Sequence, residues 1–574
     1  MLAHVQINGF EYTEDTSLTI LQVAKKHGVN IPTLCYLVKP ESNFEHRPAS
    51  CRVCIVEVVG RRNLVPACST YITDGMVIYT NSIRVRSERK AVVELLLSNH
   101  PNDCLTCEKC GNCELQNVAT ELGIKRNNFV GPLSQANEEK IMGSIRRNPS
   151  KCILCHRCTE LCEKVQSVNA ITASQRGFKT IISESYDCVN CGQCVQVCPT
   201  GALLQVDNTR EIDAIIHNTD KYVVVHTAPS VRVALGEEFG LEPGTDVTGK
   251  MITALRMIGF KKVFDTNFSA DLTIMEEAKE LVSRLQNGGK LPMITSCCPG
   301  WINFIETQYP ELLSLPSSCK SPQEMLSSII KTYYAKKEGL DPHNIVVVSL
   351  MPCIAKKDEL QREALKVDGM QATDYSMSTK EFAAMLKRFG IDLKSLPDGQ
   401  FDSPLGMSSG AADIFGKSAG VMEAAIRTAY MWMNNDYLND IEFHGLFGIP
   451  NAREAHVMMD EDTVLDICVV AGLASARQIL ERVKNGEAHY HFIEVMACPG
   501  GCINGGGQPI DYRKDHGEVI SGRRKGLINI DKNKSLRVSC ENEDIQKLYK
   551  EFLIEPNSQV AHHILHTSYS NRKN

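Results

Sequence analysis

The chain has 574 residues, 43% of them hydrophobic and 23% charged, and a formal net charge of −6 at pH 7. That length predicts several domains, and the charge balance gives no reason to expect a nucleic acid or a membrane surface as partner. The N-terminus, MLAHVQINGFEY, alternates like a strand and lacks the pattern of a signal peptide. No apolar run approaches membrane-spanning length. We therefore expect a soluble cytoplasmic protein.

The 24 cysteines are the unusual part of this composition. The cytosol keeps thiols reduced, and disulfide frameworks occur mostly in small secreted domains. Metal ligation is the better interpretation, and it requires clustered spacings.

Residues 1–80 predict a small β-grasp domain of the ferredoxin type. Two strands in HVQINGFEYTEDTSLTI precede a helix at LQVAKKHG and a strand at CIVEVVG. Its cysteines are Cys35, Cys51, Cys54 and Cys68. Their spacing is similar to that of plant-type [2Fe–2S] domains, although the first gap is longer, and zinc is a minor alternative.

Residues 81–125 predict a second, smaller iron–sulfur domain, with a helix that ends near LLLSNH. The candidate ligands are His100, Cys104, Cys107 and Cys113. A lone histidine is more often an ordinary surface or core residue. Because Cys110 also allows an all-cysteine set, the spacing alone does not choose between His100 and Cys110.

Residues 126–210 predict a domain with two [4Fe–4S] clusters. Its first part, 126–150, is polar and non-periodic and is interpreted as a linker. The runs CILCHRCTELC and CVNCGQCVQVCP then repeat C-x2-C-x2-C-x3-C, in which the fourth cysteine of each run ligates the other cluster. One cluster would be held by Cys152, Cys155, Cys158 and Cys198, and the other by Cys188, Cys191, Cys194 and Cys162.

Residues 211–574 predict a large two-lobed α/β domain with parallel sheets. The expected strands are YVVVHTAPS, KVFDTNF, LPMITSCC, NIVVVSLMPC, DICVVAG and HFIEVMAC. The expected helices include GKMITALRMIG, IMEEAKELVSRLQ, SPQEMLSSIIKTYYAKK and GVMEAAIRTAYMWM, and the tail RRKGLINIDKNKSLRVSCENEDIQKLYKEFL indicates a loop and a closing helix.

Four strand ends of this domain carry candidate site residues, because chemistry in parallel sheets gathers at the carboxyl ends of strands. The cysteines there are Cys297, Cys298, Cys353, Cys498 and Cys502. An isolated cysteine is by default an inert core residue. Cys298, Cys353, Cys498 and Cys502 are four cysteines at converging strand ends, which argues against that default, so we expect one shared site.

The motifs TSCCPGW (295–301), MPCIAKK (351–357) and MACPGGCINGGGQP (496–509) together resemble those of the [FeFe]-hydrogenases. The resemblance covers nearly the full length and implies reversible oxidation of H₂ to protons and electrons. It also implies an H-cluster, which is a [4Fe–4S] cube joined by a cysteine sulfur to a diiron unit with CO, cyanide and an azadithiolate. The cube ligands implied are Cys298, Cys353, Cys498 and Cys502, with Cys502 as the bridge.

The resemblance also implies roles for residues around the diiron unit. Cys297 matches the proton carrier, and the onward proton relay would be Glu277, Ser317, Glu280 and Arg284. Without the resemblance, MEEAKELVSR would be interpreted as an ordinary solvated helix face. Lys356, Ser230 and Gln323 match hydrogen-bond donors, and the apolar lining would be Pro229, Met351, Met496 and Phe415. The resemblance favours His100 over Cys110 and implies one [2Fe–2S] and three accessory [4Fe–4S] clusters.

The segments GRRNLVPAC (60–68) and LSNHPNDCLTCEKCGNCELQ (97–116) resemble the catalytic subunits of multimeric, NAD(P)-linked and often electron-bifurcating hydrogenases. No strand–GxGxxG–helix pattern is present, so NAD(P) would bind flavin-containing partner subunits. Ferredoxin and maturation proteins for the diiron unit are the other expected partners. The competing hypothesis is a non-catalytic iron–sulfur assembly or sensor protein, against which the intact TSCCPGW argues.

Overall fold

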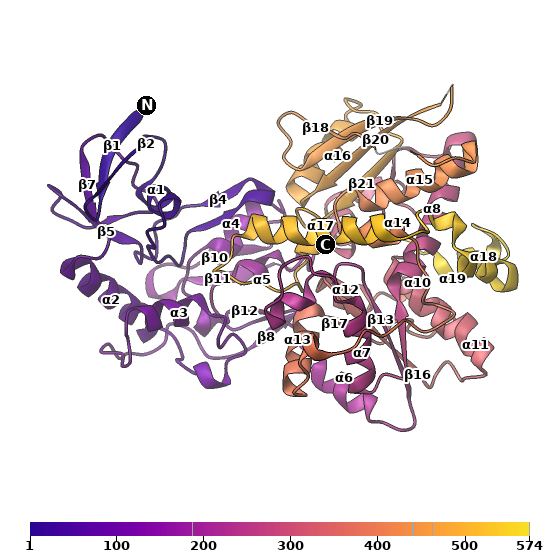
Figure 1. Cartoon of the computed structure of the whole chain (residues 1–574), viewed down its shortest axis with the longest axis horizontal. Coiled ribbons are helices and arrows are strands. Elements are labelled where there is room, and N and C mark those ends of the chain that lie inside the picture. The colour runs from indigo at the N-terminus through magenta and orange to yellow at the C-terminus, as the bar shows by residue number, and fades with distance from the viewer. Residues whose placement is uncertain (186, 439–440, 462, 573–574) are drawn as a thin grey trace. The chain divides into compact units, whose positions relative to one another are not determined.

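The computed structural model describes residues 1–185, 187–438, 441–461 and 463–572. The chain divides into two compact units (Figure 1). The first comprises Met1–Lys164, Asn169–Tyr186 and Cys194–Leu204, and the second comprises Val165–Val168, Asp187–Gln193 and Gln205–Asn574. The second unit therefore includes a short segment from the repeated cysteine runs.

The first unit begins with a five-stranded sheet in the order β2-β1-β7-β5-β6. Its strands are β1 (Leu2–Ile7), β2 (Phe10–Asp15), β5 (Ile55–Val58), β6 (Val65–Pro66) and β7 (Met76–Tyr79). Alternate residues of β1 are buried, as the period of a strand with one core face requires. Helix α1 (Ile20–Lys26) begins at a capping box formed by Thr19 and Gln22. The strands and the helix predicted within 1–80 are thus present.

The rest of this unit consists of helices and short strands, of which α4 and α5 contain cysteines. They are β3 (Leu37–Lys39), β4 (Phe44–His46), α2 (Ile83–Ser98), α3 (Glu114–Glu121), α4 (Arg157–Lys164), β10 (Ile171–Ser174), β11 (Ile181–Glu184) and α5 (Gln193–Val197). The interpretation of 126–150 as a linker is wrong for its second half. There β8 (Lys140–Met142) and β9 (Ile145–Arg147) form a hairpin, and β9 also pairs with β12 (Leu203–Gln205). Arg147 is buried in β9 and forms an ion pair with Glu184. Because this buried position holds a charged residue, the sequence does not show the alternation of apolar and polar residues expected of a strand.

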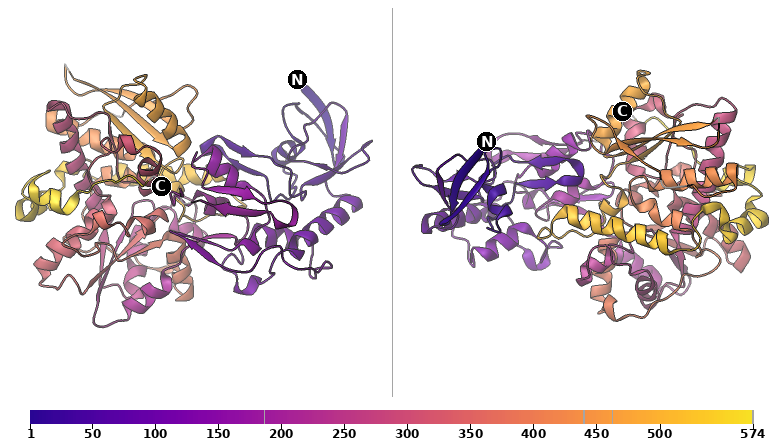
Figure 2. Two further views of the ribbon diagram at one scale, coloured as in Figure 1. Left: turned by 180° about the vertical axis from the view of Figure 1, so that it is seen from behind. Right: turned by 45° about the horizontal axis from the view of Figure 1, so that its top comes forward.

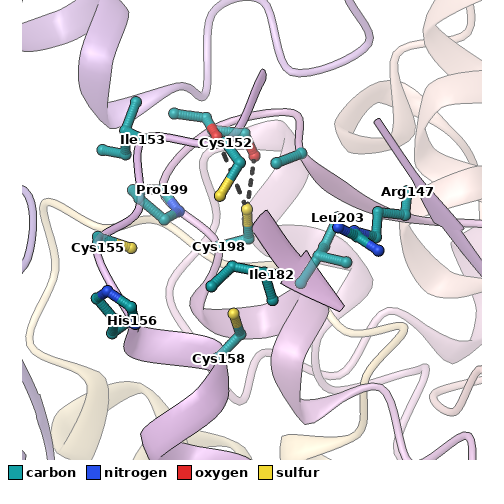
Figure 3. A pocket seen from close by; sticks show the side chains of 12 residues that line it. Arg147, Cys152, Ile153, Cys155, His156, Cys158, Ile182, Cys198, Pro199 and Leu203 are labelled. Atoms are coloured by element: carbon teal, nitrogen blue, oxygen red, sulfur yellow. Dashed lines mark hydrogen bonds between the residues drawn. The ribbon is translucent and has the colours of Figure 1, made fainter. Parts of the chain in front are cut away.

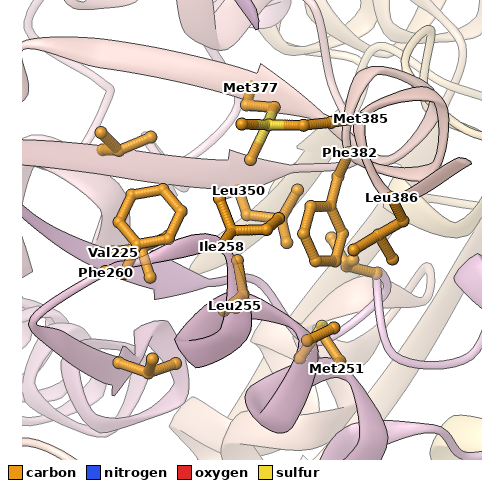
Figure 4. Packing of buried hydrophobic residues seen from close by; sticks show 14 of the residues in the cluster. Val225, Met251, Leu255, Ile258, Phe260, Leu350, Met377, Phe382, Met385 and Leu386 are labelled. Carbon is orange, nitrogen blue, oxygen red and sulfur yellow. The ribbon is translucent and has the colours of Figure 1, made fainter. Parts of the chain in front are cut away.

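The second unit contains a four-stranded parallel sheet in the order β14-β13-β16-β17. The strands are β13 (Tyr222–Thr227), β14 (Lys262–Asp265), β16 (Ile345–Met351) and β17 (Tyr375–Ser378). Val223 and Val225 face a core formed with α7 (Thr248–Ile258) and α13 (Thr379–Arg388), shown in Figure 4. Val224 faces the opposite core with α8 (Thr266–Gln286) and α10 (Pro322–Ile329). Both faces of the sheet are therefore covered, as is typical of parallel sheets.

A second sheet of this unit has the order β15-β21-β20-β19-β18. The strands β15 (Met293–Ile294), β20 (Val464–Ala471) and β21 (Phe492–Met496) are parallel. The strands β18 (His444–Gly445) and β19 (Ala452–Met458) add an antiparallel edge. The sheet is thus mixed, because the short connection from β19 to β20 can only reverse the chain direction.

The other helices of the second unit connect or cover these sheets. They are α6 (Thr209–Ile216), α9 (Pro299–Gln308), α11 (Ala335–Glu338), α12 (Ala355–Glu359), α14 (Gly410–Asp413), α15 (Gly420–Asn434) and α16 (Leu473–Lys484). Helix α8 starts well before the predicted IMEEAKELVSRLQ, because Asp265 accepts a hydrogen bond from the Asn267 N–H and ends the strand KVFD. In the part of the chain described, no helix is both long and apolar enough to cross a membrane.

The C-terminal region carries α17 (His516–Asn533), α18 (Glu543–Leu548) and α19 (Gln559–Leu565), the yellow helices of Figures 1 and 2. The loop predicted at RRKGLINIDKN is wrong, because these residues lie in α17. Asp515 caps this helix, and its buried face combines Ile520 and Leu527 with Arg523, which pairs with Glu237. Because Arg523 occupies a position in the buried face, the apolar residues of this segment do not recur at the spacing expected of a helix.

Candidate active site and metal centres

The residues predicted for the catalytic site follow four strands of the second unit. Ser230 comes after β13, Cys297 and Cys298 after β15, Cys353 after β16, and the turn 497–507 after β21. These are the carboxyl ends of parallel strands from both sheets. The topology thus brings together residues that are far apart in the sequence.

Four cysteines at these strand ends act on one another electrostatically. Burial, and then a charge on Cys298, raises the pKa of Cys353 to about 12. Burial also raises the pKa of Cys498 and Cys502, and charges on Cys298 and Cys353 add to the shift in both. Four enclosed thiols that disfavour one another's ionisation need a cationic centre to become thiolates together. This donor set fits an iron–sulfur cube.

The glycines between these cysteines allow very close backbone packing. Gly501 has φ 98°, and a Cβ there would lie 2.6 Å from the Ser418 nitrogen. A Cβ on Gly505 would lie 2.4 Å from the Pro352 carbonyl oxygen, directly before Cys353. A side chain at either position would clash with backbone, so the turn with Cys498 and Cys502 packs closely against Ser418 and against Pro352, which precedes Cys353.

Gly505→Ala is expected to destabilise the second unit by about 1–3 kcal/mol through overpacking against Pro352, and to lower the iron content. Gly445→Ala is the matched control, because a Cβ at this glycine meets nothing within 4 Å. Thermal unfolding and iron analysis of both variants check the expectation. Equal thermal stability and iron content of the two variants would show that the close contact between Gly505 and Pro352 is not required.

Polar side chains lie close to Cys297 and to one another. Lys356 Nζ donates to the Cys297 carbonyl oxygen (3.2 Å) and to Glu359 Oε2 (2.7 Å). Gln323 Nε2 donates to the same Glu359 oxygen at 3.1 Å. Ser230 Oγ is buried and has no hydrogen-bond partner among the residues that the structure describes. An unpartnered buried hydroxyl fits a ligand that accepts hydrogen bonds.

The predicted proton relay lies mainly on α8. Ser317 Oγ donates to Glu280 Oε2 (3.0 Å), and Arg284 Nη2 donates to Glu280 Oε1 (2.5 Å). Burial first, and then the charge of Glu280, raises the pKa of Glu277 to about 8. Burial and the charge of Glu277 raise the pKa of the Cys297 thiol well above its usual value. The predicted lining residues Pro229, Met351, Met496 and Phe415 are all buried.

Two neighbours of this site were not identified from the sequence. Ser296 Oγ donates to Glu277 Oε1 (3.4 Å) and to the Cys319 carbonyl oxygen (2.7 Å). Glu359 accepts hydrogen bonds from both Lys356 and Gln323. For Glu359, the only signal in the sequence was its spacing of three residues from Lys356, as on one face of a helix.

The first unit holds three groups of predicted ligands. The thiols of Cys35 and Cys51, Cys35 and Cys68, and Cys54 and Cys68 are within hydrogen-bond reach. Cys152, Cys155, Cys158 and Cys198 line one cavity, with their sulfurs turned toward its centre (Figure 3). His100 is buried, and its Nε2 has no hydrogen-bond partner in the described part of the chain. Cys110 is exposed and accepts a hydrogen bond from Gln116 Nε2 at 3.6 Å.

The last predicted set is divided between the units: Cys162 and Cys194 belong to the first, and Cys188 and Cys191 to the second. Within the second unit, a Cβ on Gly300 would lie 3.5 Å from Cys191 Cβ. Gln193 Nε2 donates to Cys498 Sγ (3.2 Å) and to the Asn504 carbonyl oxygen (2.9 Å). The segment with Cys191 therefore packs directly against the turn 497–507.

Comparison with known proteins decides what these sites belong to. The family described as "Iron only hydrogenase large subunit, C-terminal domain" matches residues 221–506. NADP-reducing hydrogenase subunit HndD of Solidesulfovibrio fructosivorans is 46% identical over 99% of this chain and 99% of its own length. The chain belongs to the [FeFe]-hydrogenase family. Iron hydrogenase 1 of Clostridium pasteurianum is 39% identical over 98% of this chain and 99% of its own.

A solved [FeFe]-hydrogenase structure agrees with this assignment. A variant of the apo [FeFe]-hydrogenase HydA1 from Chlamydomonas reinhardtii matches with a TM-score of 0.59 and 38% identity, covering 64% of this chain and all of that one. Other family descriptions match the remaining parts: a 2Fe-2S binding domain at 3–82, an iron–sulfur region of NADH-ubiquinone oxidoreductase at 89–128, a 4Fe-4S dicluster domain at 136–202, and the iron hydrogenase small subunit at 517–572.

This [FeFe]-hydrogenase is an enzyme that interconverts H₂ with protons and electrons at an H-cluster, and iron–sulfur clusters of both the 2Fe-2S and 4Fe-4S kind relay the electrons. The alternative of a non-catalytic iron–sulfur protein is therefore wrong.

Proposed function

We propose that Cys298, Cys353, Cys498 and Cys502 bind the cube of the H-cluster, with Cys502 as the bridge to the diiron unit. The mutual electrostatic effect of these enclosed thiols around a glycine turn carries this assignment. The diiron unit, when bound, supplies the redox chemistry on hydrogen. The protein supplies ligands, an apolar lining and a proton path.

The proton path begins at Cys297, whose thiol gives and regains a proton. Glu277 exchanges protons with it, because a carboxyl with a pKa of about 8 can act as acid and as base near neutral pH. Ser317 Oγ then connects to Glu280, and Arg284, with 15% of its side chain exposed, lies at the outer end. Lys356, Ser230 and Gln323 orient the diiron unit through hydrogen bonds.

The electron path uses one [2Fe–2S] cluster and three accessory cubes. We assign these to residues 1–80, 81–125 and 126–210, and the H-cluster to 211–574. The hydrogen bond from Gln193 to Cys498 fixes the segment of the second ferredoxin-like run beside the H-cluster ligands. Electrons would leave or enter the catalytic site there.

His100, rather than Cys110, is proposed as the fourth ligand of the cube in 81–125. His100→Ala is therefore expected to remove one cluster and its electron paramagnetic resonance signal, because a buried ligand nitrogen is lost. Cys110→Ser is the matched control and should keep full iron content. The opposite result, cluster loss in Cys110→Ser only, would assign the all-cysteine set.

The partners proposed are ferredoxin, maturation proteins for the diiron unit, and flavin-containing NAD(P)-binding subunits. HndD, similar over the full length, is named as a subunit of an NADP-reducing hydrogenase. The purified and matured chain should consume H₂ with ferredoxin but not with NAD⁺ or NADP⁺ alone. Reduction of either nucleotide at full rate by the isolated chain would contradict the partner proposal.

A further inference from the structure

His566, at the end of α19, lies in a hydrogen-bond network that reaches the proposed proton relay. Ser318 Oγ is 2.8 Å from His566 Nδ1 and 3.1 Å from Glu280 Oε2. On the other side of the ring, His566 Nε2 is 3.1 Å from Glu276 Oε2. His566 is thus one hydroxyl group away from Glu280.

The arrangement of Ser318 allows two proton distributions. Its hydroxyl carries one proton and faces two acceptors, Glu280 and the imidazole. When the hydroxyl donates to Glu280, the carboxylate is charged and His566 is an imidazolium whose Nδ1–H donates to Ser318. When the Nδ1 proton passes to Ser318 and the hydroxyl proton passes to Glu280, both residues become neutral. No proton is gained or lost overall.

We propose that His566 is a proton store for Glu280, coupled to it through Ser318. This inference rests on the proposed relay and adds a branch supplied by the C-terminal helix. In H₂ production the store returns a proton to Glu280 after the relay has used one. In H₂ oxidation it accepts a proton from Glu280 before Glu280 releases one to solvent.

The surroundings of His566 suit this role. Glu276 is fully buried and is fixed by donors from Tyr549 Oη (2.6 Å) and the Asn557 N–H (2.7 Å), so it can balance an imidazolium. Two backbone hydrogen bonds join the segment around His566 to the segment around Ser318. The Lys320 N–H donates to the Leu565 carbonyl oxygen (2.8 Å), and the Thr567 N–H donates to the Ser318 carbonyl oxygen (2.7 Å). These contacts keep the ring in place when its charge changes.

The other titratable and charged groups facing His566 are few. Arg284 binds Glu280 from its far side, and burial keeps the pKa of the Cys319 thiol well above its usual value. The exposed His562 ring packs on His566 at 4.1 Å between centroids, and Tyr569 Oη donates to the Ser317 carbonyl oxygen (2.7 Å). Glu280, Cys319 and His566 also offer atoms within 4.8 Å of one another. Since both imidazole nitrogens already have partners, a proton role is favoured over metal binding.

His566→Gln and Ser318→Ala test the store in the matured holoenzyme. Each is expected to lower H₂ production at the alkaline end of the pH profile by about tenfold, because a proton donor to Glu280 is lost where free protons are scarcest. The double variant should lose no more than either single variant, because both interrupt one connection. His563→Gln is the control, since this exposed histidine on the same helix bonds only Asp368 among the described residues (2.9 Å).

A second measurement does not depend on turnover. Nitrogen-15 NMR of histidine-labelled protein without the diiron unit identifies His566 by the signals missing in His566→Gln. Those signals should change their protonation pattern in Glu280→Gln and in Ser318→Ala, but not in His563→Gln. Thermal unfolding and iron content confirm that each variant is folded.

The proton-store proposal would be overturned if the His566 signals did not change in Glu280→Gln and Ser318→Ala, or if active His566→Gln enzyme kept the wild-type pH profile. If the His566 signals do change in these variants but the protein shows no H₂ turnover after confirmed maturation, the coupling of His566 to Glu280 is supported and the proposed relay function is rejected.

Discussion

Cys297→Ser is expected to lower H₂ turnover by about 10²–10⁴-fold, the usual contribution of a positioned proton-transfer group. A serine hydroxyl has nearly the same shape, but it releases a proton far less readily than a thiol. Cys297 is adjacent to the proposed ligand Cys298, and after burial the charge of Glu277 is the largest cause of the raised pKa of Cys297. The proton would thus lose its first carrier, while the metal ligands remain.

The measurement is H₂ uptake and evolution together with an infrared spectrum in the region of metal-bound CO and cyanide. The bands should remain present in Cys297→Ser, which shows that the H-cluster is assembled. Cys540→Ser is the control, because Cys540 belongs to none of the proposed ligand or relay sets. Wild-type turnover of Cys297→Ser with full bands would exclude Cys297 as the carrier.

Much of the second unit's site could be predicted because strand ends are readable from the sequence. Buried parallel strands such as β13 and β16 are continuous apolar runs, and the residues directly after them must meet at one edge of a sheet. The three cysteine motifs follow such runs. Their family resemblance then supplied the residue roles, which spacing alone did not.

The parts that could not be predicted depend on buried charges. Arg147 in β9 and Arg523 in α17 interrupt apolar patterns, yet each is buried against a glutamate. Glu359 and His566 likewise act through partners distant in the sequence. A sequence shows that such a residue is charged but not which residue will neutralise it.

Glu277→Gln is expected to lower H₂ turnover by a similar factor of about 10²–10⁴, because an amide keeps the shape of the carboxyl group but cannot pass on a proton. Ser296 Oγ could still donate to the side-chain oxygen, so the local structure should be preserved. Glu363→Gln, a glutamate with an 82% exposed side chain, is the control and should keep full turnover. Intact infrared bands with normal turnover in Glu277→Gln would remove Glu277 from the relay.

The same variant has an expected signature in stability. The pKa of Glu277 is raised from 4.5 to about 8 in the folded protein, chiefly by burial. Between these values the folded protein binds more protons than the unfolded chain, so this group's contribution to stability is complete at low pH and is lost as pH rises through 8. Glutamine does not titrate, and the unfolding midpoint of Glu277→Gln relative to wild type should therefore increase from pH 5 to pH 8, whereas Glu363→Gln should show no such trend. A difference that is constant with pH would mean that Glu277 is ionised in the folded protein, and a carboxylate in that state could accept a proton from Cys297 but would not hold one for return.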